Sequence, residues 1–135
     1  MKHYRQKMKK NILIFVFFMT IGFVGYKYLF GGRRNFASEQ AIKINSVESF
    51  FSEFSKNEAS ANKIYLNKVV EISGKITQVD ADSNSILINE KVYASFKKSD
   101  FLSLNENQNI KIKGRFLGYD DLLEELKIDN CIIIK

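Results

Sequence analysis

The first feature of the chain is an uncharged apolar run that extends from Ile12 to Tyr26. At about 1.5 Å of rise per residue, a helix over this run is roughly 22 Å long. It becomes roughly 28 Å long when Lys27 snorkels and the helix continues to Phe30, which approaches the hydrocarbon thickness of about 30 Å. The pattern therefore predicts a transmembrane helix over residues 12–30.

A basic segment before a short apolar run is also typical of a cleaved signal peptide. Cleavage requires small residues in an A-x-A arrangement, and the best candidate downstream, Asn35-Phe36-Ala37, begins with the wrong residue. No Cys directly follows the run, which excludes lipid attachment of the bacterial lipoprotein kind. We favour an uncleaved signal anchor, with a cleaved signal peptide and a buried helix of a soluble protein as the alternatives.

Positive charge flanks the apolar run unequally. Residues 1–11 carry five Lys or Arg, whereas residues 27–34 carry three. Because an excess of cations marks the cytoplasmic side of a span, we expect residues 1–11 to form a basic cytoplasmic tail. The C-terminal domain is then expected outside the cytoplasmic membrane, on its periplasmic or extracellular face.

Residues 31–45 begin with two glycines, mix charges and show no clear period, which is typical of a tether. Helical spacing follows, with Asn45 or Ser46 as the cap and an apolar face formed by Val47, Phe50, Phe51 and Phe54. A second helical segment, residues 58–66, ends before Asn67 and places on one face Ala61, Ile64 and Tyr65. The apolar face with Phe50, Phe51 and Phe54, which we call the Phe stripe, is interpreted as core packing that covers an open end of a sheet.

From Lys68 onward the period changes from helical to alternating, which predicts β-strands. Two alternating segments are long, VVEISGKITQV and NIKIKGRFLGY. Two shorter segments, SILIN and KVYASF, form a hairpin around Glu90 and Lys91, and LKIDNCIIIK closes the chain. The polar segment KKSDFLSLNENQ predicts a helical turn or loop, so that five strands follow one helical region within residues 46–135.

Each long strand has a glycine near its middle, Gly74 and Gly114. Glycine inside a strand marks a bulge or a bend where the strand passes from one sheet to another. A five-stranded barrel with a coiled first and fourth strand closes without a long free edge. The pattern predicts a mainly β fold, a five-stranded OB-fold barrel preceded by the amphipathic helix and the transmembrane helix, with an SH3-like barrel as the alternative.

Two blocks of the sequence carry a characteristic set of residues. The first block, NEASANKIYLNKVVEISGKITQV, contains Asn57, Glu58, Ala61, Tyr65, Lys68, Gly74, Lys75 and Ile76. The second block, NIKIKGRFLGYDDLLEELKIDNCIII, contains Gly114, Gly118, Tyr119, Asn130 and Cys131. The two blocks resemble the opening and the closing pattern of the tRNA_anti-like family of bacterial OB-fold proteins. The resemblance covers residues 57–134 and implies the fold. It carries over no functional residues, and it implies an exported or membrane-attached protein.

The net charge of +6 is divided unevenly along the 135 residues. Residues 1–34 contain eight of the 21 Lys and Arg and no acid, which leaves 13 cations against 15 acids, a net charge of −2, for residues 35–135. The predicted barrel is therefore mildly acidic. A high overall isoelectric point supports binding of a polyanion only when the cations lie on the domain itself.

The predicted barrel lacks the residues that most catalytic sites require. The single His, His3, lies in the basic tail, and Cys131 is the single Cys. Nucleophilic catalysis by a Ser-His or Cys-His pair and a zinc site are therefore excluded, and no glycine-rich phosphate-binding motif occurs. We expect a protein that is not an enzyme and that holds no metal and no cofactor. Cys131 is expected to be buried in the last strand.

The candidate ligand-binding residues are Lys75, Tyr93, Lys111, Lys113 and Arg115. The four cations face outward on two long strands that can lie side by side, and Tyr93 in the hairpin can stack a base, as OB domains do with single strands. The alternative interpretation is that these cations only keep outward positions soluble, which the net charge of the domain favours. The acidic group Asp120, Asp121, Glu124 and Glu125 lacks the spacing of a calcium loop and is interpreted as a solvated face.

The leading hypothesis is a non-enzymatic, membrane-anchored OB domain that binds a protein, a peptide or a small envelope ligand outside the cytoplasm. A single-stranded nucleic-acid-binding OB domain is the alternative. A third hypothesis is a purely structural or assembly module, which predicts partners but no pocket.

Overall fold

The computed structural model describes residues 2–30 and 34–135, and the chain divides into two compact units after Arg34. The first unit holds one helix, α1 (Lys2–Phe30). Its 24-residue segment Gln6–Leu29 is apolar and long enough to cross a membrane, and none of it is buried. α1 begins before the predicted span because no Gly or Pro interrupts residues 2–11. Residue 1 of the predicted tail and residues 31–33 of the predicted tether lie outside the described residues.

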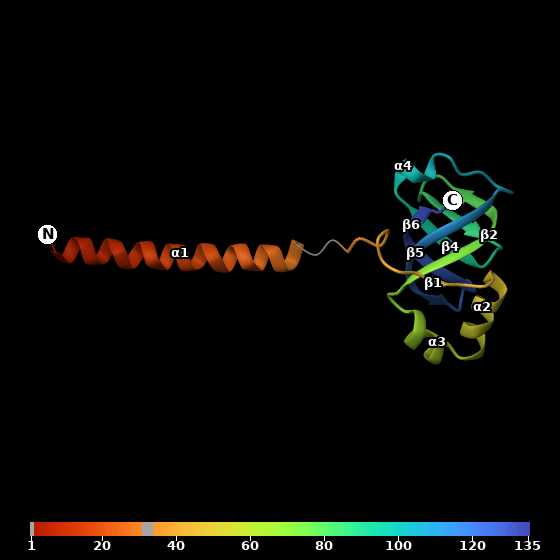
Figure 1. Ribbon diagram of the computed structural model, residues 1–135, viewed down its shortest axis with the longest axis horizontal. Helices are drawn as coiled ribbons and strands as arrows, with labels where there is room; N and C mark the ends of the chain where they lie inside the picture. The colour runs from red at the N-terminus through yellow and green to blue at the C-terminus, as the bar shows by residue number, and fades with distance from the viewer. Residues whose placement is uncertain (1, 31–33) are drawn as a thin grey trace. The chain divides into compact units, whose positions relative to one another are not determined.

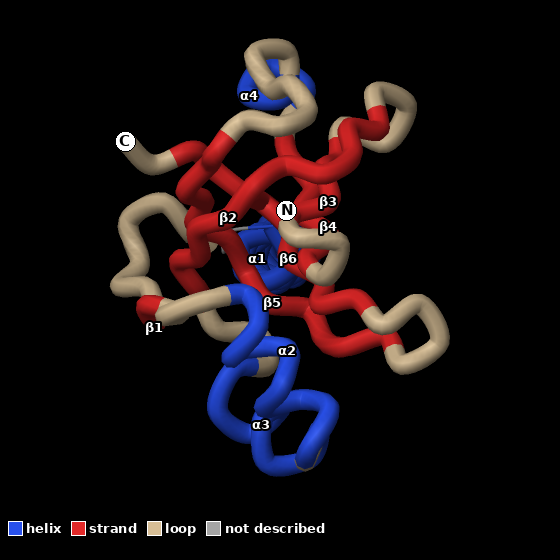
Figure 2. Tube along the Cα trace, turned by 90° about the vertical axis from the view of Figure 1, so that its right-hand side faces the viewer, coloured by secondary structure: helices blue, strands red, loops and turns tan. Residues whose placement is uncertain are grey.

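The second unit contains a small barrel and its covering helices (Figure 1). In chain order its elements are β1 (Ile42–Lys43), α2 (Val47–Lys56), α3 (Glu58–Tyr65), β2 (Val69–Asp80), β3 (Ser85–Ile88), β4 (Val92–Phe96), α4 (Lys98–Phe101), β5 (Asn109–Asp120) and β6 (Glu125–Ile133). Figure 2 shows α2 and α3 together at one end of the barrel and α4 at the other.

Five of the strands close the barrel. β2 pairs antiparallel with β5 over residues 69–75 and with β3 over residues 76–80, so that one long strand belongs to both sides of the barrel. β3 pairs with β4, β4 pairs in parallel with β6, and β6 pairs with β5, which completes the circle. This is the OB architecture that the alternating pattern predicts, and the prediction is confirmed.

Both strand glycines lie where the barrel bends. At Gly74, β2 passes from β5 to β3, and an added Cβ would collide with the Ile88 side chain. At Gly114, an added Cβ would lie 2.7 Å from the carbonyl oxygen of Asp129 and 2.8 Å from the Cys131 Sγ. Gly74 thus leaves room for the Ile88 side chain, and Gly114 lets the backbone of β5 approach the backbone of β6, which explains the glycines in the middles of the two longest strands.

α2 closes one end of the core, as the Phe stripe predicts. The Ser46 side chain accepts a hydrogen bond from the Ser49 backbone N–H at 3.1 Å and so caps the first turn. Phe50 and Phe54 are buried, and the ring of Phe50 meets the ring of Phe116 edge to face at 5.3 Å. The interpretation of the stripe as core packing is therefore confirmed.

Two local predictions fail in the segments around α2. Ile64 is 53% exposed, because α3 begins with its own cap at Asn57 and turns only Ala61 and Tyr65 toward the core. β1 lies inside the segment predicted as a tether and pairs in parallel with β2. Two residues are too few to show an alternating period, so the sequence gives no signal for this strand.

Candidate functional site

The structure brings four of the five candidate residues together on the outer face of β2 and β5. Lys75 lies on β2, and Lys111, Lys113 and Arg115 lie on β5, at positions paired with Ser73, Glu71 and Val69. All four side chains alternate with buried positions of the same strands, so they face away from the core. We call these four residues the basic stripe.

Three cations of the basic stripe have partners within the domain. Lys111 forms an ion pair with Glu71 at 3.0 Å, and the Lys113 Nζ donates a hydrogen bond to the carbonyl oxygen of Ala37 at 2.9 Å. The Arg115 guanidinium donates hydrogen bonds to both carboxylate oxygens of Asp129, from Nε to Oδ1 at 2.9 Å and from a terminal nitrogen to Oδ2.

These pairs also alter the proton affinities of the groups involved. The hydrogen bond from Lys111 lowers the pKa of Glu71, and the hydrogen bond to Asp129 raises the pKa of Arg115. Lys75 forms no ion pair within the described part of the chain. The positive charge of the stripe is therefore largely matched by carboxylates and a carbonyl of the same domain.

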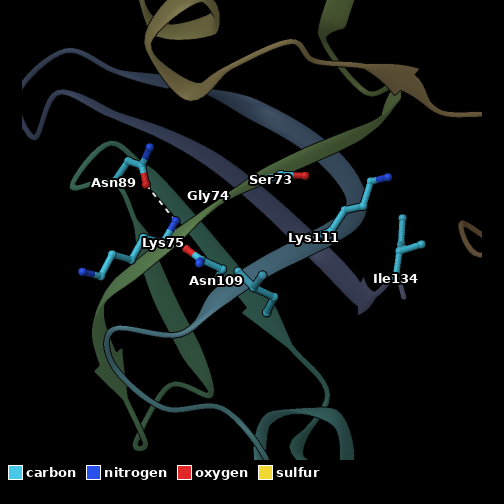
Figure 3. Close-up of a pocket in the computed structure, with 8 residues that line it drawn as sticks. Ser73, Gly74, Lys75, Asn89, Asn109, Lys111 and Ile134 are labelled. Atoms are coloured by element: carbon cyan, nitrogen blue, oxygen red, sulfur yellow. Dashed lines mark hydrogen bonds between the residues drawn. The ribbon is translucent and has the colours of Figure 1, made fainter.

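A broad, open groove of about 660 Å³ lies beside the stripe (Figure 3). It is lined by Ser73, Gly74, Lys75, Asn89, Asn109, Ile110, Lys111 and Ile134. The Asn89 side chain accepts a hydrogen bond from the Lys75 backbone N–H at 2.8 Å and donates one to Glu48 at 3.0 Å. Asn89 thus ties the β3–β4 turn to β2 and to α2, which is a structural role.

Tyr93, the fifth candidate, lies in a different cavity from the stripe. It is half-buried on β4, opposite Leu87 of β3. The cleft around it has a volume of about 240 Å³ and is lined by Gln78, Asp80, Ser85, Ile86, Leu87, Tyr93, Leu123 and Glu125. We call this the acidic cleft. Tyr93 and the basic stripe therefore line different cavities, whereas the predicted stacking of a base on Tyr93 beside the stripe requires a shared one.

One wall of the acidic cleft is fixed by hydrogen bonds around Asp80. Its carboxylate accepts hydrogen bonds from the Asp82 backbone N–H at 3.0 Å and from the Ser83 hydroxyl at 2.7 Å. The hydrogen bond from Ser83 lowers the pKa of Asp80. The Ser83 hydroxyl also shares a hydrogen bond with the fully buried hydroxyl of Ser85. The β2–β3 turn is therefore held in one conformation beside Tyr93.

The opposite wall comes from the β5–β6 turn, residues 121–124. Leu123 lines the cleft and is 60% exposed, and the neighbouring Leu122 is 92% exposed. At the base of the turn, the Lys127 Nζ pairs with Asp120 at 2.8 Å and lowers the pKa of that carboxyl. Two exposed leucines thus stand next to a surface that is otherwise acidic.

The acidic cleft was not found from the sequence. Two carboxylates line the cleft, those of Asp80 and Glu125. The adjoining turns, residues 80–85 and 120–127, hold six acids in all against the single cation Lys127: Asp80, Asp82, Asp120, Asp121, Glu124 and Glu125. Asp120 and Asp121 line a separate pocket with Tyr119 and Lys127. Within the described residues, Asp82, Asp121 and Glu125 form no ion pair. The signal in the sequence was the acidic group near residue 120, but only the closed barrel brings Asp80 and Tyr93 beside it.

Reactive groups are scarce on the described surfaces. Among residues 2–30 and 34–135, no three His, Cys, Asp or Glu side chains are grouped so that they could hold a metal ion. Cys131 is buried, as predicted, and burial raises the pKa of its thiol. A thiol held in its protonated form is a poor nucleophile.

Comparison with known proteins identifies both a family and a related fold. The sequence matches the tRNA_anti-like family over residues 1–124. A crystal structure from Klebsiella pneumoniae subsp. pneumoniae MGH 78578, described as a "putative nucleic acid-binding lipoprotein", superposes with a TM-score of 0.53 at 20% identity and covers 70% of this chain and 92% of that one. No curated protein matches the sequence. At this identity the structural likeness establishes the fold.

Proposed function

The chain belongs to the tRNA_anti-like family, and from this premise we propose that it is a non-enzymatic, single-span membrane protein whose OB domain binds a ligand outside the cytoplasm. The ligand class is a protein, a peptide or a small envelope molecule. The observation that carries the proposal is that the apolar segment Gln6–Leu29 is entirely unburied, while the barrel completes its core without it.

The composition of α1 explains why this observation points to a membrane. Its exposed side chains include large apolar residues all around the helix, such as Leu13, Phe15, Phe18, Met19 and Phe23. An apolar surface of this extent in water would drive aggregation, whereas hydrocarbon solvates it. The unequal flanking charges then favour a cytoplasmic N-terminus, which directs the barrel to the other side of the membrane.

The binding role is supported by what the barrel offers at its surface. The described residues supply no grouped metal ligands and no activated nucleophile, but the domain has a fixed cleft between two turns. OB domains bind ligands across the second and third strands of the barrel and the adjoining turns. In this chain those strands are β3 and β4, which form the floor of the acidic cleft.

Two assays, one on isolated membranes and one on spheroplasts, test the proposal. Alkaline carbonate washing of the membrane fraction should leave the full chain in the pellet, because an integral span resists extraction. Protease added to spheroplasts should then remove the barrel while a cytoplasmic marker stays intact. Release by carbonate, or protection of the barrel until the membrane is permeabilised, would overturn the anchor or the orientation respectively.

A charge variant sharpens the orientation assay. Replacement of Lys7, Lys9 and Lys10 by Gln removes the excess of cations before the span, so that the three cations after it become the larger group. We expect a mixed or inverted orientation and partial protection of the barrel. The matched control replaces three lysines of the C-terminal domain that lie far from the span in sequence, Lys63, Lys97 and Lys98, by Gln and should leave the orientation unchanged.

Binding of single-stranded nucleic acid is the second candidate function. The description of the Klebsiella protein and the basic stripe favour it, while the ion pairs of Lys111 and Arg115 reduce the charge that a phosphate backbone would meet. Its test is binding of an oligothymidylate to the detergent-solubilised chain at low salt. This candidate requires an affinity that falls steeply with salt and weakens in Lys75→Glu, and absence of binding would end it.

A further inference from the structure

The acidic cleft has a size, a floor and a charge that together define a ligand, and we infer that it binds a cationic, amphipathic segment of a partner polypeptide. The inference rests on the proposed function, because it names the ligand of the same binding domain. Its three supports are the volume of the cleft, the apolar side chains in it and the acids that line it and stand on its two adjoining turns.

The volume favours part of a larger molecule over a complete small ligand. Pockets that enclose a whole small molecule have volumes of about 300–1,000 Å³. The acidic cleft, at about 240 Å³, is smaller than that. It can take up a side chain while the rest of the partner lies across the barrel surface.

The centre of the cleft is apolar. Leu87 and Tyr93 lie opposite each other on β3 and β4 and are half-buried, so an entering side chain would complete their burial. Leu123, at 60% exposure, lines the wall beside them, and its chain neighbour Leu122 is 92% exposed. Burial of apolar surface on binding is favourable. An apolar side chain of the partner therefore gains affinity by entering the cleft.

The acids in and around the cleft favour a positively charged ligand. Asp80 and Glu125 line the cleft, and Glu125 forms no ion pair within the described residues. The adjoining turns, residues 80–85 and 120–127, hold four further acids and the single cation Lys127. Such a surface repels phosphates and anionic headgroups and speeds the approach of a cation. Among the described residues, no three carboxylates are close enough together to bind a metal ion. The separated acids instead suit a ligand whose positive charges are also separated.

The spacing of the charges matches a polypeptide. The β2–β3 turn lies at the Ser85 end of β3, while the β5–β6 turn lies near Lys91, beyond the other end of that strand. β3 spans four residues, or roughly 10 Å at about 3.3 Å per residue. A segment that crosses it can place Lys or Arg near both turns and an apolar side chain between them.

The test measures peptide binding to the full chain in nanodiscs of zwitterionic phosphatidylcholine, which do not themselves attract cationic peptides. The probe is a short fluorescent peptide of alternating lysine and leucine, followed by fluorescence anisotropy. Comparison peptides replace leucine by serine or lysine by glutamate. We expect the lysine–leucine peptide to bind, the lysine–serine peptide to bind about tenfold more weakly, since one buried side chain is worth about 1.5 kcal/mol or more, and the glutamate–leucine peptide not to bind.

Variants locate the site. Glu125→Lys reverses a charge that lines the cleft, and Leu123→Ser removes an exposed apolar wall residue. Each should weaken binding of the lysine–leucine peptide by about tenfold. The matched controls are Glu106→Lys and Leu102→Ser, which change an exposed acid and a 76% exposed leucine on the α4–β5 side of the barrel. They should leave the affinity unchanged, and thermal unfolding should show all four variants folded.

Several results would overturn the inference. Equal weakening in the controls would show that the peptide does not use the cleft, and a preference for the glutamate–leucine peptide or for an oligothymidylate would reverse the ligand class. Self-association that Glu125→Lys abolishes would assign the cleft to a second copy of the chain. Absence of binding to any probe would also overturn the inference, whereas the proposed function fails separately, in the carbonate and protease assays.

Discussion

The barrel presents two charged regions, and they differ in how their charges are partnered. In the basic stripe, Lys111 and Arg115 are paired with Glu71 and Asp129, and Lys113 donates to a carbonyl. In the acidic cleft, Glu125 forms no ion pair within the described part of the chain. The stripe is the region that the sequence predicts, yet three of its four cations already have partners within the domain.

The position of each region in the fold explains the difference. The stripe lies along β2 and β5, where the neighbouring strand positions supply carboxylates directly beside the cations. The cleft lies between turns, where acids follow one another and the nearest cations, Lys91 and Lys127, are already paired. Three of the four cations on the paired strands thus have partners within the domain, whereas Glu125 beside the β5–β6 turn forms no ion pair within the described residues.

The largest expected effect comes from a change beneath the stripe. Gly114→Ala places a Cβ 2.7 Å from the Asp129 carbonyl oxygen and from Ile128, so β5 and β6 must separate. Overpacking of this kind should lower the free energy of unfolding by about 3 kcal/mol, measured by urea denaturation in detergent. Gly25→Ala, whose Cβ meets nothing within 4 Å, is the control and should not change it. Equal stability of Gly114→Ala and the parent would contradict the close approach of the strands.

A smaller effect on stability compares a paired acid beside the basic stripe with an acid of the acidic cleft that has no ion pair. Asp129→Asn leaves the Arg115 guanidinium, at 30% side-chain exposure, without its charged partner. We expect a loss of about 1 kcal/mol in the free energy of unfolding, since the site is only partly shielded from solvent. Glu125→Gln, which removes an unpaired acid from the cleft, should change the free energy by less than about 0.5 kcal/mol. The comparison fails if the cleft variant is the more destabilised.

The smallest effect is on the acid stability of both regions. Hydrogen bonds lower the pKa of Glu71 from its ordinary value of 4.5 and the pKa values of Asp80 and Asp120 from 3.8. The folded state binds these protons less tightly than the unfolded chain, so the stabilisation is complete at neutral pH and is lost as the pH falls through this range and below it.

Melting temperatures measured from neutral pH downward test this expectation. Glu71→Gln should be less stable than the parent at neutral pH, and the difference should shrink below pH 4.5, the ordinary pKa of the group it lacks. Glu106→Gln, for which the structure gives no such partner, is the control and should follow the parent throughout. A difference that stays constant with pH would show that the Glu71–Lys111 pair does not stabilise the barrel.

The sequence predicts the fold better than the site. Three features that predict the fold involve only neighbouring residues: the change from helical to alternating period at Lys68, the strand glycines Gly74 and Gly114, and the Phe stripe. They indicate where the strands begin, where two of them bend and which helix face is buried, and the barrel agrees with all three. β1 is too short to have a period, and the orientation of Ile64 depends on a second cap at Asn57.

The cleft could not be predicted because its parts are distant in sequence. Asp80, Tyr93 and Glu125 come together only after β4 pairs in parallel with β6 and closes the barrel. The sequence correctly placed Lys75 and the three cations of β5 on one face, but it gave no sign that Asp129 would neutralise Arg115. The alternating pattern predicts which face of a strand a side chain lies on, whereas its ion-pair partner depends on the register of a third strand, here β6.

The most direct test of the account is a map of where a cationic partner binds. Backbone amide chemical shifts of the full chain in zwitterionic micelles, recorded during titration with the lysine–leucine peptide, report both regions at once. The account predicts shift changes at Leu87, Tyr93, Leu123 and Glu125 and none along Ser73–Lys75 and Asn109–Lys111. Changes that cluster on the second set, beside the basic stripe, would contradict it.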